Sequence, residues 1–215
     1  MGIGRWIAAG LGIAAVGAVA AYAKYSDTEQ APYKVVVEDG EFELREYPPI
    51  IVAQVTHTGE SMRARNASFR RLAAYIFGQD RPRGGDTIAM TAPVMTARVG
   101  EDEKIAMTAP VLQDQTGSDT WRMRFVMPAK YTLETLPAPP TDIALTELPA
   151  RRMAAVRFSG NAREAQLIEM EAKLMNWIEG RGLAATGNPE YAGYDAPMVP
   201  GPMRRNEVMI EVAAE

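Results

Sequence analysis

The chain has 215 residues, with 23 Lys and Arg against 27 Asp and Glu, and a formal net charge of −4. It contains no cysteine, which excludes disulfides, thiolate metal sites and a cysteine nucleophile. Domains that bind nucleic acid are normally basic, so the acidic balance argues against a nucleic-acid partner.

The N-terminus carries a hydrophobic segment. From Trp6 to Ala23 every residue is apolar or small, with Arg5 before the stretch and Lys24 after it. This length is close to the ~20 residues that a membrane-spanning helix needs. A retained single-span anchor is favoured by Trp6 and Tyr22, which lie where interfacial aromatic residues would lie. A signal peptide cut after Ala23 remains the alternative, because small residues precede that position.

Three sections follow from this pattern. We expect residues 1–24 to be a membrane anchor or a signal peptide, residues 25–32 to be a polar tether, and residues 33–215 to form one folded domain. A hydrophobic segment behind so short an N-terminal flank normally exports the domain that follows. The domain is therefore expected to face the periplasm, either anchored to the membrane or released by cleavage.

Strand signals and one helix fill the first half of the domain. Residues 41–55 are predicted to form strands, and apolar residues at three- and four-residue spacing predict a helix from Ser61 to Phe77. Gly78 is predicted to end that helix. The apolar stripe consists of Met62, Phe69, Leu72, Ala73 and Ile76.

A seven-residue string occurs twice. Residues 88–94 and residues 105–111 both read Ile-Ala-Met-Thr-Ala-Pro-Val. Each copy is β-prone but is interrupted by a proline, which cannot donate to a sheet ladder. We expect two strands, each with a bulge or an edge at its proline, paired as a hairpin.

The second half repeats the order of the first. Strand signals in residues 143–158 precede a helix predicted from Ala162 to Arg181, with Asn161 as its N-cap and Glu164 completing a capping box. Two halves that each run from strand to helix to strand indicate an α+β architecture and an internal structural duplication.

Several segments together resemble the SOUL haem-binding protein family, over nearly everything after residue 32. The doubled string is the family's signature, and the tail is the most specific further element. The matching segments, in the family's order, are Phe42 to Tyr47, Ile51 to Ala53, Phe69 to Gly78, Phe125 to Pro128, Leu136 to Pro139, Val156 to Gly160, Tyr194 to Pro197 and Arg204 to Val208.

The resemblance implies a specific fold and ligand. The fold is a distorted antiparallel β-barrel, built from two pseudo-symmetric βαββ halves and flanked by two helices. The ligand is haem or a related tetrapyrrole, held against one helix and the nearby loops. The implied function is non-enzymatic: buffering, transport or delivery of that ligand at a membrane or in the periplasm.

The first predicted helix carries the best candidate ligand contacts. Arg63 and Arg70 are seven positions apart, which places them about 20° apart around a helix. Their stripe borders the apolar stripe, and a porphyrin combines an apolar ring with two anionic propionates that suit guanidinium groups. Met198 and Met203 flank a Pro-Gly-Pro loop that is expected to cover the mouth of the pocket. The predicted contacts are Arg63, Phe69, Arg70, Leu72, Ala73, Met198, Met203 and Arg204.

Axial ligation of the iron is expected to be weak or absent. The chain has one histidine, His57, and residues 56–59 are predicted to form a turn, which favours a surface histidine over a metal ligand. In families like this one the position of an axial histidine is not dependable, so its lack does not refute tetrapyrrole binding. No metal site is predicted in the protein itself.

Two other functions stay open. The first is a small-molecule hydrolase that uses Glu207 in the same pocket, although a structural pair of Glu207 with Arg45 or Arg205 is the favoured reading of that carboxylate. The second is a protein-interaction module whose ligand pocket is vestigial. No nucleophile elbow, P-loop or dinucleotide motif supports catalysis.

Overall fold

The computed structural model describes residues 28–81, 86–98, 120–195 and 199–213. These residues form one antiparallel sheet with two α-helices and one 3₁₀-helix. The elements in chain order are β1 (Lys34–Asp39), β2 (Phe42–Tyr47), β3 (Ile50–Thr58), α2 (Ser61–Ile76), β4 (Val94–Arg98), β5 (Thr120–Val126), β6 (Ala144–Leu148), β7 (Arg151–Ser159), α3 (Glu164–Gly180), β8 (Glu190–Gly193), η1 (Gly201–Met203) and β9 (Arg205–Glu211).

The strand order has a two-fold pattern. The nine strands are ordered β1-β2-β7-β9-β8-β4-β5-β3-β6. Pairing of β4 with β8 joins two equivalent halves, β3-α2-β4-β5 and β7-α3-β8-β9. The strand before each half crosses over, since β2 pairs with β7 and β6 pairs with β3. Each half is therefore completed by the strand that comes just before the other half in the chain.

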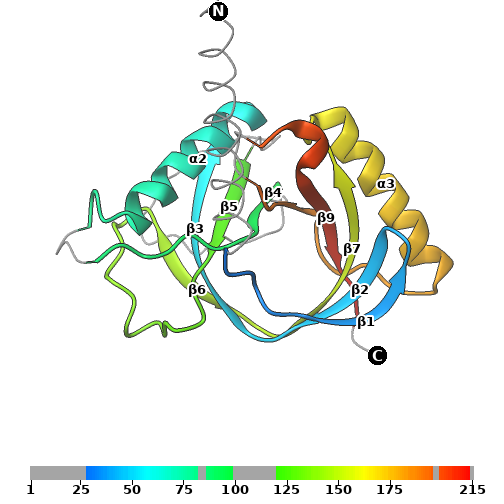
Figure 1. Cartoon of the computed structure of the whole chain (residues 1–215), viewed down its shortest axis with the longest axis horizontal. Coiled ribbons are helices and arrows are strands. Elements are labelled where there is room, and N and C mark those ends of the chain that lie inside the picture. The colour runs from blue at the N-terminus through cyan, green and yellow to red at the C-terminus, as the bar shows by residue number, and fades with distance from the viewer. Residues whose placement is uncertain (1–27, 82–85, 99–119, 196–198, 214–215) are drawn as a thin grey trace, which may run out of the picture.

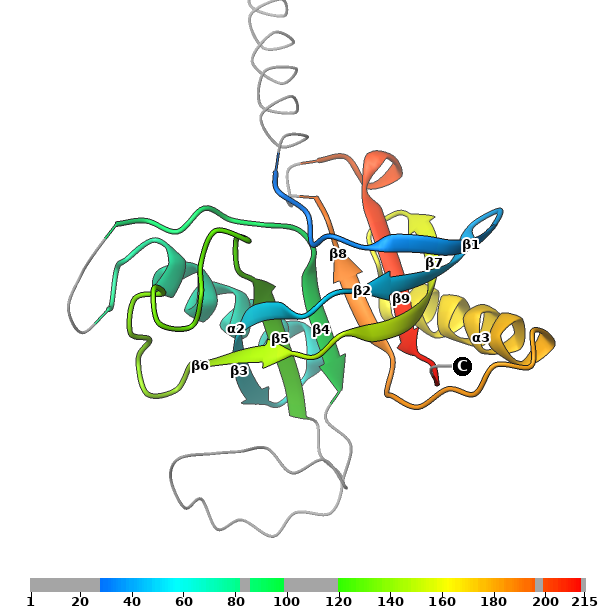
Figure 2. The ribbon, with the colours of Figure 1, turned by 90° about the horizontal axis from the view of Figure 1, so that it is seen from below.

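The sheet curves into an arch with the helices on its outside. Helix α2 packs on β3 and β5, and α3 packs on β7 and β9. Figures 1 and 2 place the two helices at opposite ends of the molecule, one on each flank of the arch. The fold is thus α+β and barrel-like. A closed barrel was predicted, but the edge strands β1 and β6 do not pair within the described residues, so the sheet stays open there.

Alternation along the strands separates an outer face from an inner face. In β2, Phe42 and Leu44 pack with the core under α3, whereas Arg45 and Tyr47 point to the inner face. Separate apolar cores underlie α2 and α3, and a third lies on the inner face. The inner face also carries most of the buried charges, which decides what it can do chemically.

Both predicted helices are present, but the second begins later than predicted. Helix α2 ends at Ile76, and Gly78 follows with a positive φ of 73°, as a helix stop requires. Helix α3 begins at Glu164 with Arg163 as its cap residue, so the predicted N-cap at Asn161 is wrong. The preceding Ala162 has a positive φ of 49°, which turns the chain away before the helix starts.

The first copy of the repeated string is not a strand along its length. Strand β4 begins at Val94, the last residue of that copy, and Ala92 makes an isolated bridge with Gln30. Ile88 is buried and donates its backbone N–H to the carbonyl of Ile76, so this segment packs against the end of α2. The second copy, residues 105–111, lies outside the described residues.

The predicted N-terminal helix of residues 1–24 also lies outside the described residues. Among the residues that are described, no helix is both long enough and apolar enough to cross a membrane.

Truncation of Leu174 to Ala tests the packing of α3. Leu174 has no exposed surface in the core beneath this helix. We expect Leu174→Ala to lower the free energy of unfolding by about 2–5 kcal/mol, because it removes buried methyl groups and leaves a cavity. Urea denaturation measures this. The control is Ile168→Ala on the same helix, where the side chain is largely exposed and the expected change is below about 0.5 kcal/mol.

Candidate functional site

The inner face of the arch holds a buried ion cluster around Glu207. Arg45 donates from Nη1 to Oε2 at 2.6 Å and from Nη2 to Oε1 at 2.9 Å. Arg205 donates from Nη2 and Nε to Oε1 at 2.7 and 3.0 Å, and the hydroxyl of Tyr194 donates to Oε2 at 2.7 Å. Arg45 and Glu207 are both fully buried. The structural pairing predicted for Glu207 is present, and it involves both arginines.

These contacts make Glu207 a poor catalytic base. Burial alone would raise the pKa of its carboxyl, but the hydrogen bonds and charges of Arg45 and Arg205 outweigh burial and lower it from 4.5 to about 2. Both carboxylate oxygens already accept at least two hydrogen bonds. A hydrolase that uses Glu207 to take a proton from water therefore finds no support in this geometry.

A second carboxylate on the inner face is bound in the same way. Glu190 is buried and accepts from Arg151 at 2.8 and 3.0 Å and from Arg124 at 2.9 Å. Burial alone would raise the pKa of Glu190, but Arg151 and Arg124 lower it. The inner face thus pairs its buried acids with arginines, and neither carboxylate is left available for a ligand cation.

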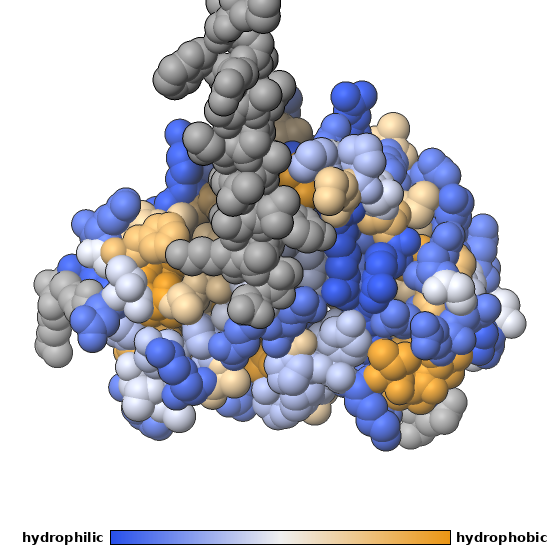
Figure 3. Space-filling view, in the orientation of Figure 1, coloured by the Kyte–Doolittle hydropathy of each residue, from blue (hydrophilic) through white to orange (hydrophobic). Residues whose placement is uncertain are grey.

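The outer face of α2 has a different character. Met62 and Phe77 are large apolar side chains with 54% and 47% of their surface exposed, and Arg63 and Arg70 are exposed beside them. At 100° per residue these four positions fall within about 100° of the helix circumference. Figure 3 shows apolar (orange) surface next to hydrophilic (blue) surface on the α2 flank.

The arginines of α2 divide into paired and unpaired ones. Arg71 forms ion pairs with Asp80 and Asp142. Arg63 forms no hydrogen bond or ion pair with any described residue, and Arg70 donates only to the backbone carbonyl of Asn66, at 3.3 Å. Two cationic groups therefore lie on one helix face without a carboxylate partner among the described residues.

The other predicted helix contacts lie at different depths. Phe69 is partly buried and meets Phe125 edge-on, with ring centroids 5.4 Å apart. Ala73 is partly exposed. Leu72 has no exposed surface, so in this structure it supports the helix from the core and cannot touch a ligand outside it.

The predicted loop residues do not join the α2 residues in one pocket. Met203 is exposed, and with Arg204 it lines a shallow depression. Arg157 of β7 and Lys173 of α3 also line this depression, so it belongs to the second half of the fold. Arg204 also donates from Nε to the carbonyl of Val199 at 2.7 Å. Met198 lies outside the described residues. In the described part, the α2 face and the η1 loop are separate surfaces.

His57 lies in a strand and not in the predicted turn. It occupies the last part of β3, and its Nδ1 is 2.9 Å from the hydroxyl oxygen of Ser68 on α2. This contact places the ring under the helix and not on its outer face. Within the described residues, no group of three or more His, Asp or Glu side chains could hold a metal ion.

Sequence reasoning missed the exposure of Met62 and Phe77. It placed Met62 on the buried stripe, whereas the buried side of α2 consists of Ala64, Ser68, Leu72, Tyr75 and Ile76. The signal was present in the small residues Ala64 and Ser68, which allow a helix to approach a sheet closely. The prediction followed the large apolar side chains instead, so it placed the buried side of the helix too close to Met62.

The Glu207 cluster predicts a pH dependence of stability. The pKa of the Glu207 carboxyl falls from 4.5 to about 2 on folding. The contribution of this carboxylate to the free energy of unfolding is therefore full above pH 4.5 and is lost as the pH falls toward 2. That contribution is about 3 kcal/mol. We expect Glu207→Gln to lower the free energy of unfolding at pH 7 by about 3–5 kcal/mol, since it breaks a buried pair.

Urea denaturation between pH 7 and pH 2 measures both effects. The wild type should lose more stability between pH 4.5 and 2 than Glu207→Gln loses. The control is Glu38→Gln, an exposed position on β1 that should follow the wild type. Parallel pH profiles for the wild type and Glu207→Gln would contradict the lowered pKa.

Comparisons with solved structures support the fold. The C-terminal domain of EcmrR is 15% identical with a TM-score of 0.56, covering 85% of this chain and 99% of that one. A hydrolase from Listeria innocua is 14% identical with a TM-score of 0.51, covering 83% and 94%. Identities this low show a shared fold alone. A search of curated proteins found no match.

The family comparison goes further. The profile described as SOUL heme-binding protein matches residues 28–101 and again residues 97–211. The two matches meet between β4 and β5 and together include every element of the sheet. The chain therefore belongs to the SOUL heme-binding protein family.

Proposed function

We propose that this protein binds haem or a related tetrapyrrole on the outer face of α2, without catalysing a reaction. The observation that carries the proposal is the pair Arg63 and Arg70, which lack carboxylate partners among the described residues and border exposed apolar side chains. Membership of a haem-binding family makes a tetrapyrrole the ligand class to expect there.

The chemistry of the ligand suits this face. The two arginines are separated by two helical turns, or about 10 Å along the axis, and their long side chains can reach two carboxylates on one edge of a macrocycle. The ring would cover Met62, Phe69, Ala73 and Phe77. Ala73 has only a methyl group, which leaves room for a flat ring between the larger side chains.

Binding is proposed to depend on the propionates and the ring and not on the iron. His57 contacts Ser68 beneath the helix, so it is not directed at this face. Haem supplies an iron centre when bound, but here the residues of the chain would hold it by its edge and its faces. Such binding is reversible, which fits buffering, transport or delivery.

Titration with hemin tests the proposal. We expect a saturable change in the Soret band, weakened about tenfold or more in Arg63→Gln/Arg70→Gln because two charge-assisted contacts of about 1 kcal/mol each are lost. The control is Lys34→Gln/Lys173→Gln, which removes two exposed positive charges from the other half. Iron-free protoporphyrin IX, followed by its fluorescence, should bind with an affinity similar to that of hemin.

Three outcomes would contradict this proposal. Equal loss of affinity in both double variants would mean that net charge and not the α2 face governs binding. No saturable change at micromolar hemin would leave a protein-interaction module as the remaining hypothesis. A strong preference for hemin over the iron-free ring would contradict the absence of axial ligation.

We also propose that residues 6–23 attach the protein to a membrane, with the domain facing the periplasm. The support is the apolar composition of this stretch. Intact mass of the protein recovered from the membrane fraction tests its fate: the full-length mass is expected for an anchor. The mass of a chain that begins at Lys24, found in the soluble periplasmic fraction, would instead identify a cleaved signal peptide.

A further inference from the structure

A cavity of about 380 Å³ lies away from the α2 face and borders the Glu207 cluster through Gln30, which accepts a hydrogen bond from Arg205 Nη1 at 3.3 Å. Its walls come from the segment that enters β1, from the start of β3, from Thr91, from the loop after β5 and from Glu147 on β6. The volume is within the range of about 300–1,000 Å³ that is typical of small-molecule sites. No residue proposed above to bind the tetrapyrrole contributes to this cavity.

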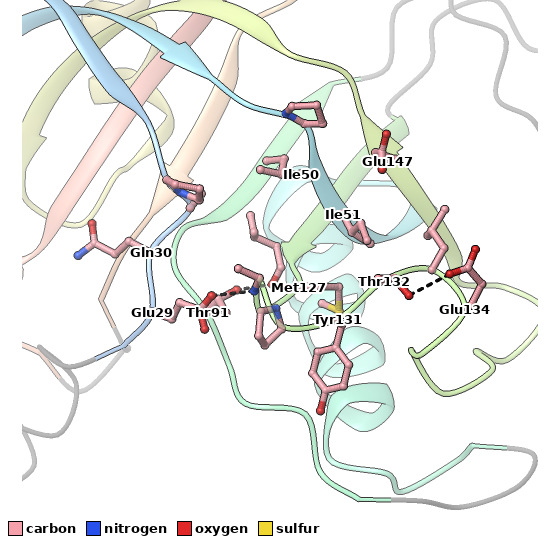
Figure 4. A pocket seen from close by; sticks show the side chains of 17 residues that line it. Glu29, Gln30, Ile50, Ile51, Thr91, Met127, Tyr131, Thr132, Glu134 and Glu147 are labelled. Carbon is pink, nitrogen blue, oxygen red and sulfur yellow. Dashed lines mark hydrogen bonds between the residues drawn. The ribbon is translucent and has the colours of Figure 1, made fainter.

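The floor of the cavity is apolar. Ile50 and Met127 are buried, and Ile51, Tyr131 and Leu133 continue the apolar wall. Figure 4 shows Ile51 and Met127 between two groups of acidic side chains, with Tyr131 beside them. A ligand seated here would remove an apolar body from water, which supplies most of the binding energy in sites of this kind.

The charged groups of the cavity are all acidic. Glu29 lies on one side and Glu134 and Glu147 on the other (Figure 4), and no Lys, Arg or His lines the cavity. Glu29 accepts from the backbone N–H of Ala129 at 2.8 Å, and Glu134 accepts from the Thr132 hydroxyl at 3.1 Å. No described cation pairs with any of the three carboxylates.

This charge pattern differs from that of the inner face. Glu207 is bound by three arginines and Glu190 by two, so the fold neutralises its buried acids elsewhere. Lys130, which is not among the lining residues, holds its ammonium 5.0 Å from the centroid of the Tyr131 ring, so this ring already contacts one cation of the chain. An anionic ligand would meet three carboxylates and is disfavoured.

We propose that this cavity is a second binding site, selective for an organic cation with an apolar body, such as a hydrophobic amine in its protonated form. The apolar floor holds the body of the ligand, and the carboxylates of Glu134 and Glu147 attract its charged head. The proposal is independent of tetrapyrrole binding, because the two surfaces share no residue and have opposite charge.

Methyl NMR of the full-length protein labelled at its methionine methyl groups tests the proposal. The probe is 4-tert-butylbenzylammonium, and its neutral partner is 4-tert-butylbenzyl alcohol, which has the same body without the charge. We expect the ammonium to shift the Met127 signal saturably and to leave the Met62 signal on α2 unchanged. The alcohol should bind about tenfold more weakly, as expected for the loss of attraction to two exposed carboxylates.

Variants of the acidic residues complete the experiment. Glu134→Gln/Glu147→Gln should weaken binding of the ammonium about tenfold and leave binding of the alcohol unchanged. Glu38→Gln, an exposed acid on β1, is the matched control and should bind as the wild type does. Met127→Leu assigns the reporter signal.

The proposal is overturned by any of three results: no saturable shift at Met127, equal affinity for the ammonium and the alcohol, or wild-type affinity in the double variant. Hemin titration of the same double variant should match the wild type. A failure of the tetrapyrrole proposal would therefore be visible separately from a failure of this one.

Discussion

The hydrogen-bonded pair of Arg45 and Glu207 ties β2 to the sheet of the second half. Arg45 lies on β2, which precedes the first half, and Glu207 lies on β9, which ends the second, so the pair joins residues 162 positions apart. Taking both charges out of water is expensive, and the pair is tolerable only because each oxygen of the carboxylate is satisfied by Arg45, Arg205 and Tyr194. The crossover of β2 onto the second half is thereby held in register.

We place the proposed ligand sites away from Glu207 and Glu190 because these carboxylates are already satisfied. Carboxylates that already accept several hydrogen bonds gain little from a ligand, and their lowered pKa values remove them as bases. Charged groups without a charge partner among the described residues include Arg63 and Arg70 on α2 and the carboxylates of the cavity beside β3 and β6. The arch therefore supports two candidate binding surfaces of opposite charge.

Sequence patterns predicted the parts of this structure that depend on neighbours in the chain. The extent of α2, the strands before each helix and the duplication all follow from local periodicity and turn residues, whereas the strand predicted at residues 88–94 begins only at Val94. The rotation of α2 did not, because it depends on how closely Ala64 and Ser68 approach the sheet. The start of α3 was misplaced because the positive φ of Ala162 is a tertiary feature that no local preference indicates.

The candidate sites depended even more on long-range contacts. A partner for Glu207 could be narrowed to Arg45 or Arg205 from the motifs, but that both bind it follows only from the crossover of β2. His57 was assigned to a turn because threonines and a glycine surround it, whereas β3 continues through it by pairing with β5. The acidic cavity was not foreseen, since its walls come from five separate segments.

The two-fold pattern of the fold supplies an internal comparison for the ligand site. Helices α2 and α3 occupy equivalent positions in the two halves, so selection for the fold alone would not give them opposite charge. Helix α2 has four arginines and no acid, whereas α3 has four glutamates and a single lysine, which pairs with Glu169. Only Arg71 of the α2 arginines is used in ion pairs with described acids, so the remaining charge on α2 is not explained by stability. The proposed dianionic ligand would account for a cationic α2 opposite an acidic α3, and the arginine variants test that asymmetry directly.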